Sequence, residues 1–456
     1  MVADQITLLT ALDERIDKMT SACTRCGKCA EVCPMPARTD VDNSQPVQLI
    51  SAVIDRLTDG ANPSNAQAEH WAGVCCGSGF CIKACPEDLN PRFLLAMVRR
   101  AASKVSKTLH DRRAGGRIEF KKMSRGVRVL SRLQMPPEVL NRLSPSSHPE
   151  TERAPDVVFY TGCNLLKTPH IGLLCLDVLD VLELRYEVHG GPSNCCGIHQ
   201  TRSGDDENGV RQSMTTIDKL TRSEPGEILS WCPTCQIQFG ESMFPIRVAS
   251  SDSTPQGPVD MTMFPVFLQR NLDRLRPYLK FPVPKRVALH EHPGSEGVTE
   301  AVAAVLSEIP ELEVVTLPVA RIGYALSSLS PIARQRAALI AEELTAAEAA
   351  GVDVLAGIYH SDHREIIAHH PYWPFDVVNY MELIGQSIGI SHIDTFKRLK
   401  TMRDVDSIVR ECMPLIEQHG LDLNEVRQVI ESDMLGEQIL PVDREHHVAI
   451  LAARNA

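Results

Sequence analysis

The chain has 456 residues, of which 43% are hydrophobic and 23% are charged, as in an ordinary globular protein with a sizeable core. The length suggests about three domains. The formal net charge of -11 argues against general affinity for nucleic acid or membrane surfaces. No run of about 18 apolar residues is present, and acidic residues interrupt the N-terminus where a secretory signal would be apolar. We expect a cytoplasmic protein, or one held at a membrane by a partner.

The first group of cysteines lies in the stretch SACTRCGKCAEVCPMP, residues 21–36. Cys23, Cys26, Cys29 and Cys33 have the spacing C-x-x-C-x-x-C-x-x-x-C-P, which is typical of ferredoxins. Three thiolates on one tight loop can reach three irons of one cubic cluster. A structural zinc site usually pairs two C-x-x-C knuckles instead, so the pattern favours iron and sulfur.

The second group of cysteines, HWAGVCCGSGFCIKACPEDLNP, has the same spacing with one gap. Counting back from Cys85, the ferredoxin pattern requires ligands at positions 81, 78 and 75, and position 78 is a serine. In two-cluster ferredoxins the fourth cysteine of each run binds the other cluster. The sequence therefore predicts two 4Fe-4S clusters with crossed ligands. The first is expected on Cys23, Cys26, Cys29 and Cys85, and the second on Cys33, Cys75 and Cys81.

The fourth ligand of the second cluster has several candidates. Cys76 can reach the cluster through the flexible loop around Ser78, since glycines flank the serine on both sides. Ser78 could bind as an alkoxide, or the site could hold a three-iron cluster. A fourth reading makes Cys76 a packed small residue with no second cluster. We favour a 4Fe-4S cluster that uses Cys76.

Apolar residues at helical spacing predict helices over 5–18, 46–57 and 91–102, which complete an α-helical ferredoxin domain at 1–105. Residues 106–155 are expected to form a basic linker, because lysines and arginines greatly outnumber acids between Arg99 and Arg132. This basic block is either a solvated face or a docking surface for an acidic partner subunit.

Three short apolar runs follow, at 156–161, 183–189 and 226–231, and each reads as a strand. Cysteines come after each run: Cys163, then Cys195 and Cys196, then Cys232 and Cys235. In a parallel α/β sheet, strand ends converge on one edge where ligands bind. Five thiolates at one edge suit an iron–sulfur cluster better than zinc, which takes four ligands.

A two-cluster ferredoxin followed by C-x31-C-C-G-x35-C-x-x-C resembles the heterodisulfide reductase superfamily, with the C-type and B-type subunits fused as in the D-type subunit. The resemblance covers roughly residues 15–400. It implies a non-cubane 4Fe-4S cluster, at which a disulfide or sulfur-bridged substrate is reduced or formed. Its ligands would be Cys163, Cys195, Cys196, Cys232 and Cys235. His199, just after the CCG motif, is the candidate proton donor.

The order of elements repeats over 281–400, which indicates an internal duplication without the cysteines. Arg321-Ile322-Gly323 stands where CCG would be, so one non-cubane cluster is expected. Four histidines fall at the predicted strand ends: His290, His292, His360 and His363. They could bind a metal, line a proton-donating pocket or lie at the surface.

The sequence therefore predicts an α+β protein: a helical two-cluster ferredoxin module, a duplicated α/β CCG domain with parallel sheets, and a helical C-terminal extension. The repeats are expected at 156–280 and 281–400, and the extension at 401–456. Expected partners are other subunits of a redox complex, either a flavoprotein or a membrane electron-transfer subunit, and a sulfur-containing small-molecule or carrier-protein substrate. Two other functions stay open: an electron conduit without its own substrate, and the iron–sulfur subunit of a glycolate- or lactate-type 2-hydroxyacid oxidase.

Overall fold

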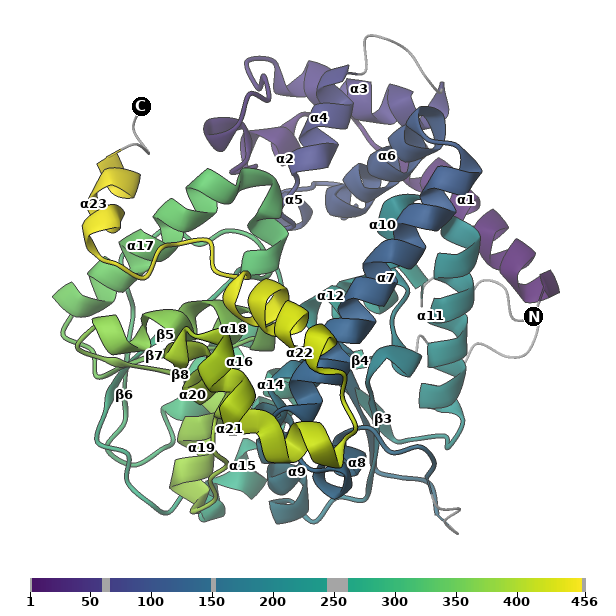
Figure 1. The fold of residues 1–456 in the computed structure, drawn as a ribbon. Helices are drawn as coiled ribbons and strands as arrows, with labels where there is room; N and C mark the ends of the chain where they lie inside the picture. Colours follow the sequence, from purple (N-terminus) through teal and green to yellow (C-terminus); the bar gives the residue numbers. More distant parts are fainter. Residues whose placement is uncertain (1, 60–65, 149–152, 244–260, 453–456) are drawn as a thin grey trace.

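The computed structural model describes residues 2–59, 66–148, 153–243 and 261–452 (Figure 1). The N-terminal part is helical, and two small parallel sheets follow, which confirms the α+β prediction. No helix among the described residues is both long enough and apolar enough to cross a membrane.

The N-terminal module packs four longer helices around a core that includes Trp71, Val53 and Val98. Pro46 and Pro91 stand at the first positions of two of these helices, where their missing N–H groups cost nothing. Each cysteine loop makes a left-handed turn at a glycine, Gly27 or Gly79, and then one short helix. The elements are α1 (Val2–Ala22), α2 (Lys28–Glu31), η1 (Pro36–Arg38), α3 (Pro46–Thr58), α4 (Ala66–Val74), α5 (Phe80–Lys83) and α6 (Pro91–Ser106).

The first α/β half has four parallel strands in the order β2-β1-β3-β4. The strands are β1 (Val157–Gly162), β2 (Tyr186–Gly190), β3 (Glu227–Ser230) and β4 (Met261–Met263). The helical elements are η3 (Asn164–Lys167), α9 (Pro169–Val181), η4 (Pro192–Asn194), α10 (Ile198–Ser203), α11 (Asp206–Thr221), α12 (Pro233–Ile237), η5 (Gln238–Met243), α14 (Phe264–Arg270), α15 (Leu272–Leu275) and η6 (Arg276–Tyr278).

The second half repeats this topology with the order β6-β5-β7-β8, again all parallel. The strands are β5 (Arg286–His290), β6 (Glu313–Val315), β7 (Val354–Gly357) and β8 (Asp376–Asn379). The helical elements are α16 (Val298–Leu306), η7 (Leu326–Ile332), α17 (Ala333–Ala349), α18 (His360–Ile366), η8 (Ile367–Tyr372) and α19 (Tyr380–Ile388). The matching strand order is the structural sign of the duplication that the sequence predicts.

The segment predicted as a basic linker is largely helical instead. It forms α7 (Leu109–Arg132), capped by a reciprocal Thr108–Asp111 pair, and α8 (Pro137–Leu143). Buried Met123, Val127 and Leu130 pack α7 into the body of the protein, and the helix lies against α10 and the C-terminal extension (Figure 1). Residues 149–152 of the predicted linker lie outside the described part of the chain.

Basic side chains of α7 are partly neutralised by the protein's own acids. Arg113 pairs with Glu207 at 2.6 Å, and Arg128 pairs with Glu425 of the extension. Because this helix contains so many charged residues, its apolar face could not be recognised from the sequence.

The C-terminal extension crosses from the second half to α7 (yellow in Figure 1). Ile430 and Met434 are fully buried in a core shared with Val129 of α7. Asp433 forms a buried ion pair with Lys167 at 3.3 Å, next to the first sheet. The elements are α20 (Thr395–Met402), α21 (Val405–Gln418), α22 (Leu423–Val429), η9 (Ile430–Leu435) and α23 (Glu445–Ala452).

The contact between α7 and the extension gives a test of the fold. Replacing a glycine inside a helix by alanine usually stabilises a protein by about 0.5–1 kcal/mol. At Gly126, however, the added Cβ would overlap the Asp433 carboxylate and lie 3.1 Å from Lys167 Nζ. We expect Gly126→Ala to destabilise the protein by about 1–3 kcal/mol, measured by chemical denaturation.

Gly115→Ala is the matched control, because the nearest atom to its added Cβ is Ser203 Oγ at 3.6 Å, an ordinary contact. This variant should be as stable as the original protein or slightly more so. Equal stability of the two variants would show that α7 does not pack on the extension in this way.

Candidate iron–sulfur centres

The first ferredoxin site brings together all four cysteines predicted for it. Cys23, Cys26, Cys29 and Cys85 line one pocket, although Cys85 comes from the second cysteine run. Apolar side chains complete the walls, namely Ile50, Leu89 and Leu94. Cys29 is buried and Cys26 is exposed, so the pocket reaches the protein surface at Cys26.

The second site is a separate pocket lined by Cys33, Cys75, Cys76 and Cys81. Cys33 comes from the first run, so the ligands cross as in two-cluster ferredoxins. Trp71 Nε1 donates a hydrogen bond to Cys33 Sγ at 3.2 Å, which orients this sulfur.

Ser78 lines the second pocket too, and its hydrogen bonds bear on the fourth ligand. The backbone N–H of Gly323, in the second α/β half, donates to Ser78 Oγ at 2.8 Å. A hydroxyl has one proton to donate, and Cys76 Sγ lies 3.2 Å from the same oxygen. Either atom can donate in this contact, and a Cys76 thiolate bound to iron would accept the serine proton. The choice between the two residues stays a prediction.

Burial raises the pKa of five of these thiols, namely Cys23, Cys29, Cys33, Cys76 and Cys81. It raises the pKa of Cys29 to about 12, with a further contribution from neighbouring Cys23, and that of Cys33 to about 11. At neutral pH such thiols hold their protons unless a cation compensates for the buried negative charge. Four cysteine sulfurs around one apolar pocket match the ligand set of an iron–sulfur cluster. Packing of the protein core alone does not require four thiols at one place.

The third site lies at the edge of the first sheet where β1, β2 and β3 end. Cys163 follows β1, Cys195 and Cys196 follow β2, and Cys232 and Cys235 follow β3. Their thiols contact one another in an unbroken series: Cys163, Cys195, Cys196, Cys235 and Cys232. The structure thus brings together all five cysteines that the sequence singled out.

Hydrogen bonds fix the loop that carries the paired cysteines. Thr216 Oγ1 donates to the carbonyl oxygen of Cys195 at 2.8 Å, and Ser213 Oγ donates to that of Cys196 at 2.7 Å. Gly197 has a φ of 79° and turns the chain away, and a Cβ there would lie 2.9 Å from Ser213 Oγ. The glycine of the CCG motif is therefore required for both conformation and space.

The pKa values of the five thiols are shifted in different directions. Contacts with the thiols of Cys163 and Cys196 lower the pKa of Cys195, and the contact with Cys195 raises the pKa of Cys163. The thiol of Cys235, helped by backbone amides at the start of α12, lowers the pKa of Cys232 to about 7. Four of the five cysteines are buried, and Cys232 is partly exposed. Five adjacent sulfurs outnumber the four ligands of zinc and fit a cluster of several irons.

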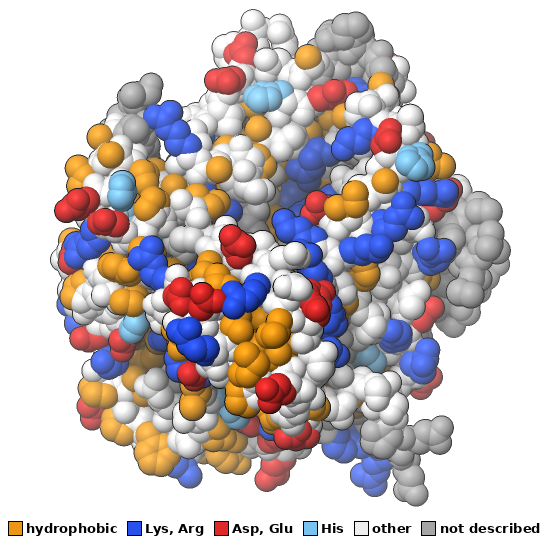
Figure 2. All heavy atoms as spheres, viewed as in Figure 1, with side chains coloured by type: hydrophobic (Ala, Val, Ile, Leu, Met, Phe, Trp, Pro, Cys, Tyr) orange, Lys and Arg blue, Asp and Glu red, His pale blue; other side chains and the backbone are white. Residues whose placement is uncertain are grey.

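A cleft lies beside this site, where the three parts of the protein meet. Its walls include Arg99 of α6, Arg202 of α10 and Tyr324 of the second half, and Cys75 and Thr234 also line it. Figure 2 shows Lys and Arg side chains gathered around the hollow below the helical module. The cleft could not be predicted from the sequence, because no motif joins residues from three separate parts of the chain.

Arg202 is exposed in this cleft, and its Nη2 donates to the Tyr324 hydroxyl at 2.6 Å. The neighbouring Tyr324, Cys196 and Cys232, which attract the guanidinium when they are ionised, raise the pKa of Arg202. The guanidinium is thus a fixed cation next to the five-cysteine site.

His199 is half-buried on α10 near Cys195; burial lowers its pKa, and a thiolate at Cys195 opposes this. Its role as proton donor stays a prediction. The four histidines of the second half do not form one group. His290 and His292 lie together, whereas His363 hydrogen-bonds Asp394 elsewhere.

Two family models match the chain. One, described as a 4Fe-4S dicluster domain, matches residues 22–90, and the other, described as a cysteine-rich domain and named CCG, matches residues 157–240. Comparison with curated proteins and with solved structures gave no match. The chain contains the pair of modules typical of heterodisulfide reductase-like proteins. These modules indicate a function in iron–sulfur electron transfer.

The second pocket gives a test of its ligands. Cys76→Ala should lower the iron content of anaerobically purified protein, by about one iron if a three-iron cluster remains and by about four if the cluster is lost. Ser78→Ala should keep the full iron content, because it removes only a hydrogen bond to the sulfur. Iron analysis with EPR of the oxidised protein measures both. A loss of iron in Ser78→Ala with none in Cys76→Ala would identify the serine as the ligand.

Proposed function

We propose that this chain is the iron–sulfur oxidoreductase subunit of a heterodisulfide-reductase-like complex, in which it reduces or forms a disulfide or sulfur-bridged substrate. The observation that carries the proposal is the unbroken series of five cysteine thiols at the edge of the first sheet, beside a cleft. A chain that only passed electrons would need no cleft at its last centre.

The order of the sites supports a path for electrons. The first ferredoxin site reaches the surface at Cys26, where a partner such as a flavoprotein subunit can dock. Cys75 of the second site lines the cleft, and the loop around Ser78 touches the second half. In this proposal electrons pass from the first site to the second and then to the five-cysteine site.

The reaction balances as a two-electron reduction: RSSR′ + 2e⁻ + 2H⁺ gives RSH and R′SH, and the reverse direction returns both electrons to the partner. Iron–sulfur clusters, when bound, accept and release the electrons singly. The protein's own residues supply the place, the charge and the protons.

Within the cleft, Arg202 can stabilise the negative charge that develops on a sulfur, since its guanidinium faces the cleft next to Cys196 and Cys232. Cys232 is the most accessible cysteine of the site, so a substrate would approach from its side. His199, near Cys195, is the proton donor in this proposal.

Addition of a disulfide tests the proposal against the electron-conduit alternative. We expect a small disulfide with charged ends to change the EPR spectrum of the oxidised, cluster-loaded protein, because the substrate meets the five-cysteine centre directly. A spectrum that no thiol or disulfide changes would support the conduit.

The arginine in the cleft gives a second test. Arg202→Gln should lower kcat/KM for an anionic disulfide by about tenfold or more, because it removes a charge-assisted contact worth about 1.5–3 kcal/mol. The EPR signals of the clusters should stay. Arg211→Gln, an exposed arginine on α11 bonded to Asn208, is the matched control and should leave kcat/KM unchanged. Equal effects of the two substitutions on kcat/KM would show that Arg202 does not stabilise charge on the substrate sulfur.

A further inference from the structure

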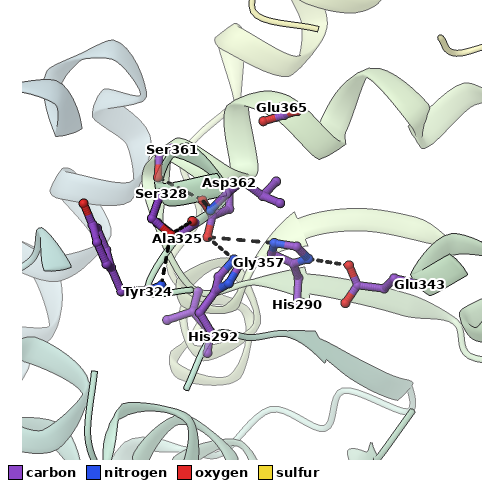
Figure 3. A network of polar contacts seen from close by, with 12 residues as sticks. His290, His292, Tyr324, Ala325, Ser328, Glu343, Gly357, Ser361, Asp362 and Glu365 are labelled. Atoms are coloured by element: carbon purple, nitrogen blue, oxygen red, sulfur yellow. Dashed lines mark hydrogen bonds and ion pairs between the residues drawn. The ribbon is translucent and has the colours of Figure 1, made fainter. Parts of the chain in front are cut away.

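The second sheet carries a compact polar group at the edge that corresponds to the five-cysteine edge of the first sheet. His290 ends β5, His292 follows two residues later, and Asp362 lies on α18 just after β7. One ligand atom from each residue lies within 4.8 Å of the other two, and all three residues are buried. Figure 3 shows the two imidazoles and the carboxylate turned toward one another.

The protonation of His290 follows from its partner. Its Nδ1 contacts a carboxylate oxygen of buried Glu343. Glu343 also pairs with Arg321, as expected of a carboxylate, which can only accept the hydrogen bond from His290. The Nδ1 atom therefore carries a proton, and Nε2 presents a lone pair when the ring is neutral.

His292 is held by an acceptor in the same way. Its Nδ1 lies 2.7 Å from the carbonyl oxygen of Ile322, which can only accept a hydrogen bond. Its Nε2 therefore presents a lone pair when the ring is neutral. Both histidines have the arrangement of metal ligands whose second nitrogen is held by an acceptor in the outer shell.

Asp362 is held through one of its two oxygens. Oδ1 accepts hydrogen bonds from the Leu326 N–H and the Ser361 hydroxyl, both at 2.9 Å. Oδ2 points toward the histidines, 3.3 Å from His292 Nε2 and 3.8 Å from His290 Nε2. The carboxylate can therefore bind a metal through one oxygen while the other stays fixed.

None of these three atoms makes a hydrogen bond to any described residue. When both rings are neutral, two lone pairs and a carboxylate oxygen face one another in a buried space and repel, and a cation between them removes the repulsion. Tetrahedral zinc with ligands at about 2.0–2.1 Å places neighbouring ligand atoms about 3.3 Å apart. The His292 Nε2–Asp362 Oδ2 distance is 3.3 Å, and the His290 Nε2–Asp362 Oδ2 distance of 3.8 Å is somewhat longer.

A second group of histidines and acids joins the two halves. It contains His170, His363, Glu382 and Asp394. There Asp394 Oδ2 pairs with His363 Nε2 at 2.7 Å, and Oδ1 caps α20 through the Lys397 N–H. Both oxygens of this carboxylate accept hydrogen bonds, which Asp362 Oδ2 does not, although the ring nitrogens of His170 make none either.

We propose that His290, His292 and Asp362 bind one divalent transition-metal ion, zinc being the ion favoured, with water at the remaining position. Two histidines and one carboxylate also suit Fe²⁺, and the experiment below distinguishes the two ions. The inference does not depend on the proposed redox function. The loop 322–326 forms hydrogen bonds with His292 and Asp362, and it also contains Tyr324, which lines the cleft. A bound ion would therefore stabilise the position of Tyr324 in the cleft.

Metal analysis and X-ray absorption of the anaerobically purified, cluster-loaded protein test the proposal. We expect about one zinc per chain, with a nitrogen and oxygen shell at about 2.0 Å and no sulfur at about 2.3 Å. Asp362→Asn, which keeps the shape of the side chain, should lower zinc at least tenfold and leave iron unchanged. His369→Gln is the control, because His369 is buried on η8, outside the group, and should keep the zinc.

If Asp362→Asn does not fold, as judged by circular dichroism, His292→Gln takes its place with the same expected result. A high-spin Fe²⁺ in the Mössbauer spectrum that the substitution removes would identify the ion as iron and support the site. A zinc shell that contains sulfur, or the lack of any metal that responds to either substitution, would overturn the proposal.

Discussion

Both candidate sites of the α/β domain depend on one constraint: parallel strands end at the same edge of a sheet. In the first half β1 lies between β2 and β3, so the loops after three neighbouring strands meet. Cysteines that are dozens of residues apart in the sequence become contacting thiols at that edge. The second half has the same strand order, and the same edge gathers His290, His292 and Asp362 in place of sulfur. One topology thus offers two kinds of ligand set.

One arginine of the helical module contacts both α/β halves at the junction of the three parts. Arg92 on α6 donates to the carbonyl oxygens of Gly77, at 2.7 Å, and Gly294, at 2.8 Å, and it pairs with Glu241. These partners belong to the second ferredoxin loop, the second half and the first half. Because the guanidinium is buried, its loss would leave several polar groups without partners. The shape of the cleft between the three parts rests on this junction.

The cysteine sites could be predicted from the sequence, because they follow from the spacing of the cysteines and from two general rules. In two-cluster ferredoxins the fourth cysteine binds the other cluster, and parallel strands end at one edge of a sheet. The crossed position of Cys85 and the meeting of the five later cysteines both follow from motifs and strand ends. The fourth strand of each half was missed, since β4 and β8 have only 3 and 4 residues and no clear alternation.

Other features depended on tertiary contacts that the sequence does not display. The apolar face of α7 was obscured by its many arginines and lysines, so a packed helix was read as a linker. Asp362 and Glu343 carry no motif, and the histidine pattern pointed to His360 and His363 in their place. Arg202 follows the CCG motif closely, yet its importance comes from Tyr324, which is more than a hundred residues away.

The iron content of the cluster-loaded chain tests the central claim most directly, namely that five sulfurs at one sheet edge hold a cluster of several irons. With one iron at each cluster corner, three four-iron centres give about 12 irons per chain. Replacing Cys195 and Cys196 together by serine should remove about four of these irons and leave the ferredoxin signals in place. An original chain with about eight irons, unchanged by the double substitution, would contradict the account.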